Sequence, residues 1–256
     1  MLVVGDGCTD DSETVVARIG DPRVRWVNLP ERFGHQSGPN NEGLRQAAGD
    51  LIAYLGHDDL WLPHHLSLLV TAIERSGDDM AHSLVARVYP NGDVRPATSG
   101  PDFGSWVPPS CTLHRRSVTQ TIGGWRDYRE IELTPEMDLW QRAGKAGLRF
   151  TTVPRLTAIK FPASLRRDVY RIRPCHEQAE WLARIRSEPD IEAVTLGRII
   201  ADGYDVRTMT YRKLASRFVT QTIARLRRRF AQRWMRVVFP SRKNPGLVAA
   251  QRFKGL

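Results

Sequence analysis

The chain has 256 residues, 41% of them hydrophobic, which is ordinary for one α/β domain with an additional segment. No apolar run reaches the length of about 18 residues that spans a bilayer, and the N-terminus lacks the pattern of a signal peptide, so we expect a cytoplasmic protein. Three widely spaced cysteines without a CxxC pair argue against a disulfide framework and a zinc site.

The net charge of +10 is concentrated near the C-terminus. Residues 206–256 contain 14 Lys and Arg and no Asp or Glu, so the first 205 residues carry +10 minus 14, or −4. This distribution favours a catalytic body with an appendage that faces a polyanion or a membrane. We therefore expect two regions, a domain at 1–165 and a helical, Arg-rich region at 166–256.

Strands and helices alternate over the first sixty residues. A short strand at 2–4 is followed by a Gly- and Asp-rich turn and a helix, and a second strand is expected at 24–29. A helix at 40–48 then leads to an apolar strand at 51–55. This order predicts a doubly wound α/β sheet, mostly parallel, in which the strand at 51–55 is buried and central.

The strand at 51–55 ends at Gly56-His57-Asp58-Asp59. Adjacent carboxylates at the carboxyl end of a central strand lie where open α/β sheets bind their ligands. Hard oxygen ligands there suit Mg²⁺ or Mn²⁺ carrying a substrate phosphate. The alternative is that Asp58 and Asp59 only cap a helix beginning near Pro63, and this segment alone leaves both interpretations open.

The next elements are an amphipathic helix at 64–75 and a strand at 80–89. The Pro- and Gly-rich segment 96–109 is expected to be a mobile loop at the mouth of the site. Closing strands are expected at 149–153 and 156–161. Two histidines begin the helix at 64–75, and we expect both to face solvent because no further zinc ligands are evident.

A second acidic motif, Pro135-Glu136-Met137-Asp138, begins a helix that runs to about Lys145. A carboxylate at such a place can accept a proton from a hydroxyl nucleophile. Alternatively, Glu136 and Asp138 stabilise the positive end of the helix dipole. Cations follow within a few tens of residues, and one of Lys160, Arg166 and Arg167 could pair with a diphosphate, although surface solvation suits each of them.

VVGDGCTDDS and GPNNEGLRQAAGDLIAYLGHDDLWLP together resemble the nucleotide-binding half of the family 2 glycosyltransferases, whose fold is the GT-A type. The family pattern is a strand ending in D-D-G-S-T-D, an Asn-x-Gly helix, and a strand ending in an Asp-x-Asp metal motif. By this resemblance Asp6 contacts the nucleotide base, Asn41 and Gly43 match the Asn-x-Gly, and Asp58 holds the metal on the diphosphate. The resemblance covers roughly residues 2–160.

The resemblance also gives roles to the second acidic motif. The family has E-D-x-D-L at this place, with its second acid as the general base, and that position holds Glu136 here. Asp138 would bond the loop or the acceptor. Gly56 and His57 stand where the family often has Asp and a small residue, so Asp58 and Asp59 must supply the charge of the motif. Asp58, together with Asp59 or His57, would position the metal on the two phosphates.

The resemblance is incomplete at the start of the chain. Gly5 replaces the first Asp of D-D-G, and the family normally begins with one more strand and helix, which nothing before Leu2 supplies. A sheet without that inner strand is expected to have open edges.

The expected fold is a GT-A-like doubly wound mixed sheet with a helical basic C-terminal extension. The expected function is that of an inverting glycosyltransferase dependent on Mg²⁺ or Mn²⁺. It would move a sugar from a nucleoside diphosphate donor to a carbohydrate or lipid-linked acceptor in polysaccharide or glycolipid assembly. The alternative is a non-catalytic, membrane-associated partner derived from such an enzyme.

A helical pattern runs from Pro174 to near Pro240 and contains an apolar stripe beside a cationic one. The stripe suits a helix lying on an anionic membrane surface, which would make the protein peripheral on the inner face of the membrane. A helix packed on its own domain with a solvated Arg face is the alternative. Specific nucleic-acid binding is not expected, since no basic aromatic sheet or helix-turn-helix is present. The apolar stripe consists of Ile223, Leu226, Phe230, Trp234 and Val237, and the cationic one of Arg225, Arg229, Arg233 and Arg236.

Overall fold

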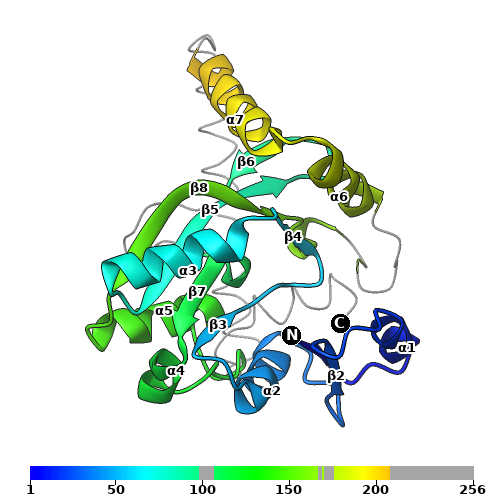
Figure 1. Ribbon diagram of the computed structural model, residues 1–256, viewed down its shortest axis with the longest axis vertical. Helices are drawn as coiled ribbons and strands as arrows, with labels where there is room; N and C mark the ends of the chain where they lie inside the picture. Colours follow the sequence, from blue (N-terminus) through cyan, green and yellow to red (C-terminus); the bar gives the residue numbers. More distant parts are fainter. Residues whose placement is uncertain (98–106, 167–168, 170–175, 208–256) are drawn as a thin grey trace, which may run out of the picture.

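The computed structural model describes residues 1–97, 107–166, 169 and 176–207. They form a mixed α/β fold with a curved sheet and helices on both of its faces (Figure 1). The strands are β1 (Leu2–Gly5), β2 (Arg25–Asn28), β3 (Leu51–Ala53), β4 (Asp59–Trp61), β5 (Met80–Val88), β6 (Val94–Pro96), β7 (Thr112–Arg115) and β8 (Phe150–Lys160). The helices are α1 (Ser12–Ala17), α2 (Ser37–Gln46), α3 (His65–Ser76), α4 (Arg116–Ile122), α5 (Pro135–Lys145), α6 (His176–Ser187) and α7 (Ile191–Arg207), with short 3-10 turns η1 (Pro109–Cys111) and η2 (Ala163–Leu165).

The main sheet has six strands in the order β3, β7, β5, β8, β4, with β6 paired to β5. Only β5 and β8 are parallel neighbours, and the other pairs are antiparallel. The predicted doubly wound mixed sheet is confirmed, but the prediction that it is mostly parallel is wrong. The two strands predicted at 149–153 and 156–161 form the single strand β8, whose pairing with β5 shifts register around Ser83 and Leu84.

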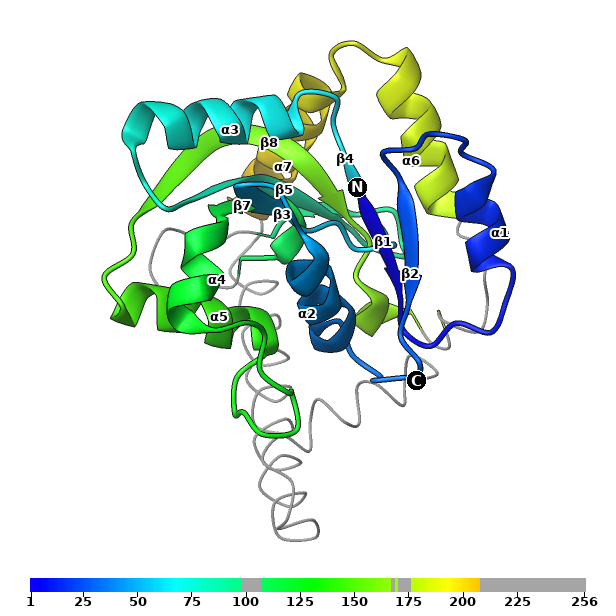
Figure 2. The same cartoon turned by 60° about the horizontal axis from the view of Figure 1, so that its bottom comes forward.

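The first two strands form a separate parallel pair, seen beside the main sheet in Figure 2. In the described part of the chain β1 pairs only with β2, and β3 only with β7. The strand predicted at 51–55 is therefore an edge strand of the main sheet and not a central one. Helix α2 packs on β1, where a Cβ on Gly43 would lie 3.7 Å from Cγ2 of Val4.

Helices cover the two faces of the sheet because strand side chains alternate between them. Ala81 of β5 faces α3 and packs with Leu69 and Ile73. The preceding residue, Met80, faces the other side and packs with Leu139 of α5. Both helices thus bury an apolar stripe against the same strand, and this fixes α5, with its acidic first turn, relative to the sheet.

Helices α6 and α7 pack on the far part of the sheet. Trp181 of α6 and Ile191 of α7 belong to one buried cluster with Leu62, Val88 and Phe161. The beginning of the region predicted as a helical extension therefore shares the core of the α/β fold. The apolar and cationic stripes predicted at 223–237, and residues 98–106 of the predicted mobile loop, lie outside the described residues.

None of the helices described here has the length and apolar character needed to cross a bilayer.

The first turn of α3 differs from its prediction, because His65 is buried. Its ring stacks on Trp61 at 4.5 Å, and Nδ1 lies 2.6 Å from Oγ1 of Thr157. Burial lowers the pKa of His65 to about 4, with a smaller contribution from the neighbouring His64. His65 therefore packs in the core and does not face solvent as predicted, whereas His64 is partly exposed and lies 3.2 Å from Glu192.

Candidate functional site

The acidic motif after β3 lies on a loop that crosses one end of the sheet. Because β3 and β4 are at opposite ends of the strand order, the chain between them passes the other strands. The loop ends in a tight turn in which the Asp59 N–H donates to the Gly56 carbonyl at 3.0 Å. A Cβ on Gly56 would lie 3.0 Å from Oδ1 of Asp58 and 3.2 Å from Oδ2 of Asp59, so both carboxylates converge over the glycine.

Asp59 is held by two residues from distant segments. Lys160, the last residue of β8, donates from Nζ to Oδ2 at 2.8 Å and to Oδ1 at 3.2 Å. The Ser110 hydroxyl, from η1, donates to Oδ2 and accepts the N–H of Gly56 at 3.2 Å. The carboxylate of Asp59 is thus buried in a network that also fixes the start of the turn. The capping interpretation is wrong, because α3 begins without a side-chain cap.

Asp58 has different surroundings from its neighbour. Its side chain is half-buried, and among the described residues its carboxylate accepts no hydrogen bond and forms no ion pair. The two adjacent acids therefore differ in availability: one is committed to the protein, and the other is open to a ligand.

Glu136 lies in the first turn of α5, close to Lys160. Burial alone would lower the pKa of Lys160, but the charges of Asp59, Asp58 and Glu136 outweigh this effect and raise it. The Glu136 side chain is 7% exposed, and Oε2 accepts a hydrogen bond from Nε2 of Gln36 at 3.4 Å. Both acidic motifs therefore act electrostatically on the same ammonium group, that of Lys160.

Asp138, also buried in the first turn of α5, turns away from this group. Its carboxylate pairs with Arg142 at 2.8 Å and with Arg126 at 3.5 Å. Arg142 in turn donates to the carbonyl of Gly124 at 2.7 Å. Asp138 thus ties α5 to the segment that follows α4.

Asp6 organises the loop between β2 and α2. Its carboxylate accepts the N–H groups of Phe33 and Gly34, each at 2.8 Å. Gln36, which contacts Glu136, is two residues further along. The end of β1 is therefore connected to the acidic turn of α5 through one short loop.

The predicted Asn-x-Gly residues lie on α2, where they hold the helix in place. Asn41 and the backbone of Trp125 exchange two hydrogen bonds of 2.8 Å, and Gly43 faces β1. His57 is exposed at the tip of the acidic loop, and its carbonyl accepts a hydrogen bond of 2.9 Å from Gln178 of α6. These residues surround the site on the side of β1 and α6 without joining the acidic group.

We expect Gly124→Ala to lower the free energy of unfolding by about 2 to 4 kcal/mol, because overpacking adds to the loss of the Asn41 hydrogen bonds. A Cβ on Gly124 would lie 2.4 Å from Oδ1 of Asn41. Urea unfolding measures the change. Gly197→Ala is the control, since its Cβ meets nothing within 4 Å and the helix α7 should gain stability. Equal urea midpoints for Gly124→Ala and Gly197→Ala would contradict the structural role of the hydrogen bonds between Asn41 and Trp125.

The carboxylate ligands that the site offers fit one mode of metal binding. Among the described residues no three His, Cys, Asp or Glu side chains are placed to hold an ion together. Mg²⁺ and Mn²⁺ often bind through only one or two carboxylates, with substrate phosphates and water completing the shell. Asp58 fits that requirement.

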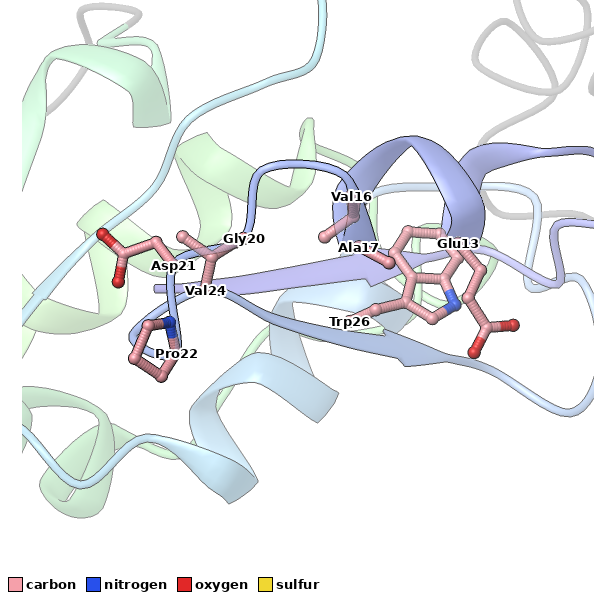
Figure 3. Close-up of a pocket in the computed structure, with 8 residues that line it drawn as sticks. All are labelled: Glu13, Val16, Ala17, Gly20, Asp21, Pro22, Val24 and Trp26. Atoms are coloured by element: carbon pink, nitrogen blue, oxygen red, sulfur yellow. The ribbon is translucent and has the colours of Figure 1, made fainter.

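A separate hollow lies between α1 and β2 (Figure 3). Val16, Val24 and Trp26 supply much of its apolar wall, with Glu13 and Asp21 at its rim. None of the candidate residues above lines it, so the site is formed by the loop ends at the sheet and not by this hollow.

Lys160, Arg166 and Arg167 were the three candidates for pairing with a diphosphate, and the structure places them differently. Arg166 pairs with Glu177 of α6 at 2.6 Å, and Arg167 lies outside the described residues. Ser110 and Gln36 have no motif or spacing that indicates a role, and only the folded arrangement identifies them.

Comparison with known proteins connects this geometry to a family. Residues 1–131 match the family described as "Glycosyl transferase family 2". An uncharacterized glycosyltransferase of Nostoc sp. is 30% identical over 77 residues, which are 30% of this chain and 24% of that protein. The succinoglycan biosynthesis protein ExoO of Rhizobium meliloti is 35% identical over 81 residues, 32% of this chain and 23% of that protein.

The solved structures that resemble this fold include TarS of S. aureus. A TarS fragment in complex with UDP-GlcNAc superposes with a TM-score of 0.54 over 63% of this chain and 49% of that chain, at 16% identity. The same fragment in complex with UDP gives a TM-score of 0.52 over 76% and 64%. At this identity the likeness shows the fold alone. The matches cover about a quarter of the length of the Nostoc and Rhizobium relatives.

Proposed function

Because this chain belongs to glycosyl transferase family 2, we propose that it transfers a sugar from a nucleoside diphosphate donor to a hydroxyl acceptor in polysaccharide or glycolipid assembly. The observation that carries the proposal is the Asp59–Lys160 pair at the end of β8, on whose ammonium group the charges of Asp58 and Glu136 also act. Two acidic groups with different surroundings offer the two things that such a transfer needs: a ligand for the metal that would bind the charged leaving group, and a proton acceptor.

We assign the donor site to Asp58 and Asp6. Asp58 is the carboxylate open to Mg²⁺ or Mn²⁺, and the metal would offset the charge that develops on the leaving diphosphate. Asp6 holds the loop at 33–34, and by the family resemblance its carboxylate faces the nucleoside. The UDP-GlcNAc and UDP complexes of TarS support a UDP-sugar as the first donor class to test.

We assign the general base to Glu136. A sugar hydroxyl becomes a strong enough nucleophile when a carboxylate accepts its proton as the new bond forms. Attack on the anomeric carbon from the side opposite the diphosphate is a single displacement, and it inverts the anomeric configuration. Gln36 donates a long hydrogen bond of 3.4 Å to the carboxylate.

The other predicted residues would support the site without touching the reacting atoms. Asp138 and Asn41 each anchor a segment beside the donor site, and Gly43 lies where α2 packs on β1. Asp59, predicted as a second metal ligand, is proposed to shape the turn that presents Asp58. His57 remains a candidate for contact with the diphosphate from its exposed position.

Acceptor and membrane contacts are proposed from the relatives and the sequence. The name of the Rhizobium relative favours a polysaccharide or its lipid-linked precursor as acceptor. The basic stripe at 225–236 would hold the protein on the inner face of the membrane, where such precursors are assembled.

The second candidate function is a non-catalytic partner derived from a glycosyltransferase. The unpaired edges of β1 and β3 in the described residues and the glycine at position 56 favour it. A donor site that binds nucleotide but transfers no sugar to any acceptor extract would support this candidate over the first.

Calorimetric titration of the purified chain with UDP, GDP and dTDP, with and without Mn²⁺, tests the donor site. We expect one nucleotide to bind in the micromolar to millimolar range, and only in the presence of the metal, because the Asp58 carboxylate and the diphosphate repel each other unless a cation bridges them. Manganese-independent binding of all three nucleotides with equal affinity would contradict the proposal.

A further inference from the structure

Lys160 lies directly opposite Asp59 across the pair of strands β8 and β4. Both carboxylate oxygens of Asp59 accept hydrogen bonds from its ammonium group, and Ser110 donates to one of them as well. Because the register of two paired strands fixes the partners, this contact belongs to the sheet and not to a flexible loop.

Lys160 is the more exposed member of a buried pair. The Asp59 side chain is 1% exposed and that of Lys160 is 17% exposed, so the carboxylate is buried together with the ammonium group that binds it. An ion that approaches the acidic turn meets Asp58 first, and it would have to displace a buried, hydrogen-bonded ammonium group to reach Asp59.

We propose that Lys160 is a built-in counter-ion that keeps Asp59 out of the metal's ligand set, so that the divalent cation binds only together with a nucleoside diphosphate. This inference rests on the donor site of the proposed function. Asp58 alone supplies one charged oxygen ligand, which is too few for a hard cation in water, and the diphosphate oxygens supply the rest. Lys160 is thus a positioning residue, and it makes the binding of the metal depend on the nucleoside diphosphate.

The removal of Lys160 should therefore create a metal site that the natural chain lacks. Without the ammonium group, Asp58 and Asp59 become two neighbouring carboxylates at the same turn, which converge over Gly56. The site would then bind Mn²⁺ in the absence of nucleotide.

The experiment measures Mn²⁺ binding to the full chain by electron paramagnetic resonance, without nucleotide. We expect no binding at millimolar Mn²⁺ for the natural chain, and an affinity at least about tenfold higher for Lys160→Met. The double variant Lys160→Met with Asp59→Asn should lose this gain. Lys145→Met, which removes an exposed lysine from α5, is the matched control and should behave as the natural chain does.

Lys160→Met leaves a buried carboxylate without its partner, so folding is checked by thermal unfolding. Lys160→Gln serves as the second variant, since its amide can still donate to Asp59 but carries no charge. In both variants added Mn²⁺ should raise the melting temperature, and in the double variant it should not.

Two results would overturn the inference: nucleotide-free Mn²⁺ binding by the natural chain that Asp59→Asn abolishes, or equal Mn²⁺ affinity of the natural chain and the Lys160 variants. Failure of the proposed function has a different signature. If the natural chain bound no Mn²⁺ together with UDP, GDP or dTDP, the proposed donor site would be wrong. The comparison of Mn²⁺ affinity between the natural chain and the Lys160 variants without nucleotide would still show whether Lys160 keeps Asp59 from binding the metal.

Discussion

Replacement of Glu136 by glutamine is expected to lower kcat by about 10² to 10⁴, the range that a positioned proton acceptor typically contributes. The amide has nearly the same shape as the carboxylate but cannot accept the proton of the acceptor hydroxyl. The buried position of Glu136 and its hydrogen bond from Gln36 mean that the substitution changes chemistry more than packing. Turnover of the donor against a saturating acceptor is the measurement.

The affinity of the Glu136→Gln variant for metal and nucleotide should equal that of the natural chain, since Glu136 is not assigned to the donor site. Asp138→Asn is the matched control, because it lies on the same turn and pairs with Arg142. It should lower stability by about 1 to 3 kcal/mol through the weakened buried pair, with a smaller loss of kcat. If Asp138→Asn lost more turnover than Glu136→Gln, the assignment of the base would be wrong.

Asp58→Asn is expected to weaken metal-dependent nucleotide binding by about 100-fold or more, equivalent to about 2.7 kcal/mol. The carboxylate is the single charged protein ligand assigned to the metal, and an amide oxygen is a poorer ligand for a hard cation. Calorimetric titration with nucleotide in the presence of Mn²⁺ measures the change. Stability should be affected little, because Asp58 accepts no hydrogen bond from the described residues.

Asp202→Asn, an exposed acid on α7, is the control for the loss of one negative charge. It should bind metal and nucleotide as the natural chain does. Unchanged affinity in Asp58→Asn would remove Asp58 from the donor site and leave the function of the acidic loop unexplained.

The boundaries of helices and strands were predictable from the sequence to within three residues where hydrophobic periodicity and flanking Gly and Pro residues indicated them. The helices expected at 40–48, 64–75 and 135–145 appear as α2, α3 and α5. Their apolar spacing determines which side is buried, and this information is local. The acidic motifs were found for the same reason, since Asp58 and Glu136 each follow a local signal.

The pairing of strands was not predictable, because it depends on segments far apart in the chain. β7 inserts beside β3 in the antiparallel direction, and nothing in residues 51–55 indicates that partner. The contact of Ser110 with Asp59 was not predicted from the sequence for the same reason, because it depends on segments far apart in the chain. Its hydroxyl meets Asp59 only because η1 precedes β7, and a serine after two prolines is a common turn residue. The burial of His65 likewise depends on Thr157 of β8, far from it in the sequence.

The pairing of Asp59 with Lys160, 101 residues apart in the chain, also has a consequence for how the protein acquires its function. Contacts between residues so far apart form late, because the chain must close long loops before it gains from them. The acidic turn cannot take its shape until β8 has added to β5 and β4 has added to β8. During synthesis both acidic motifs therefore exist before the turn that carries Asp58 and Asp59 has its final shape, and we expect the proposed donor site to form only after β8 has docked.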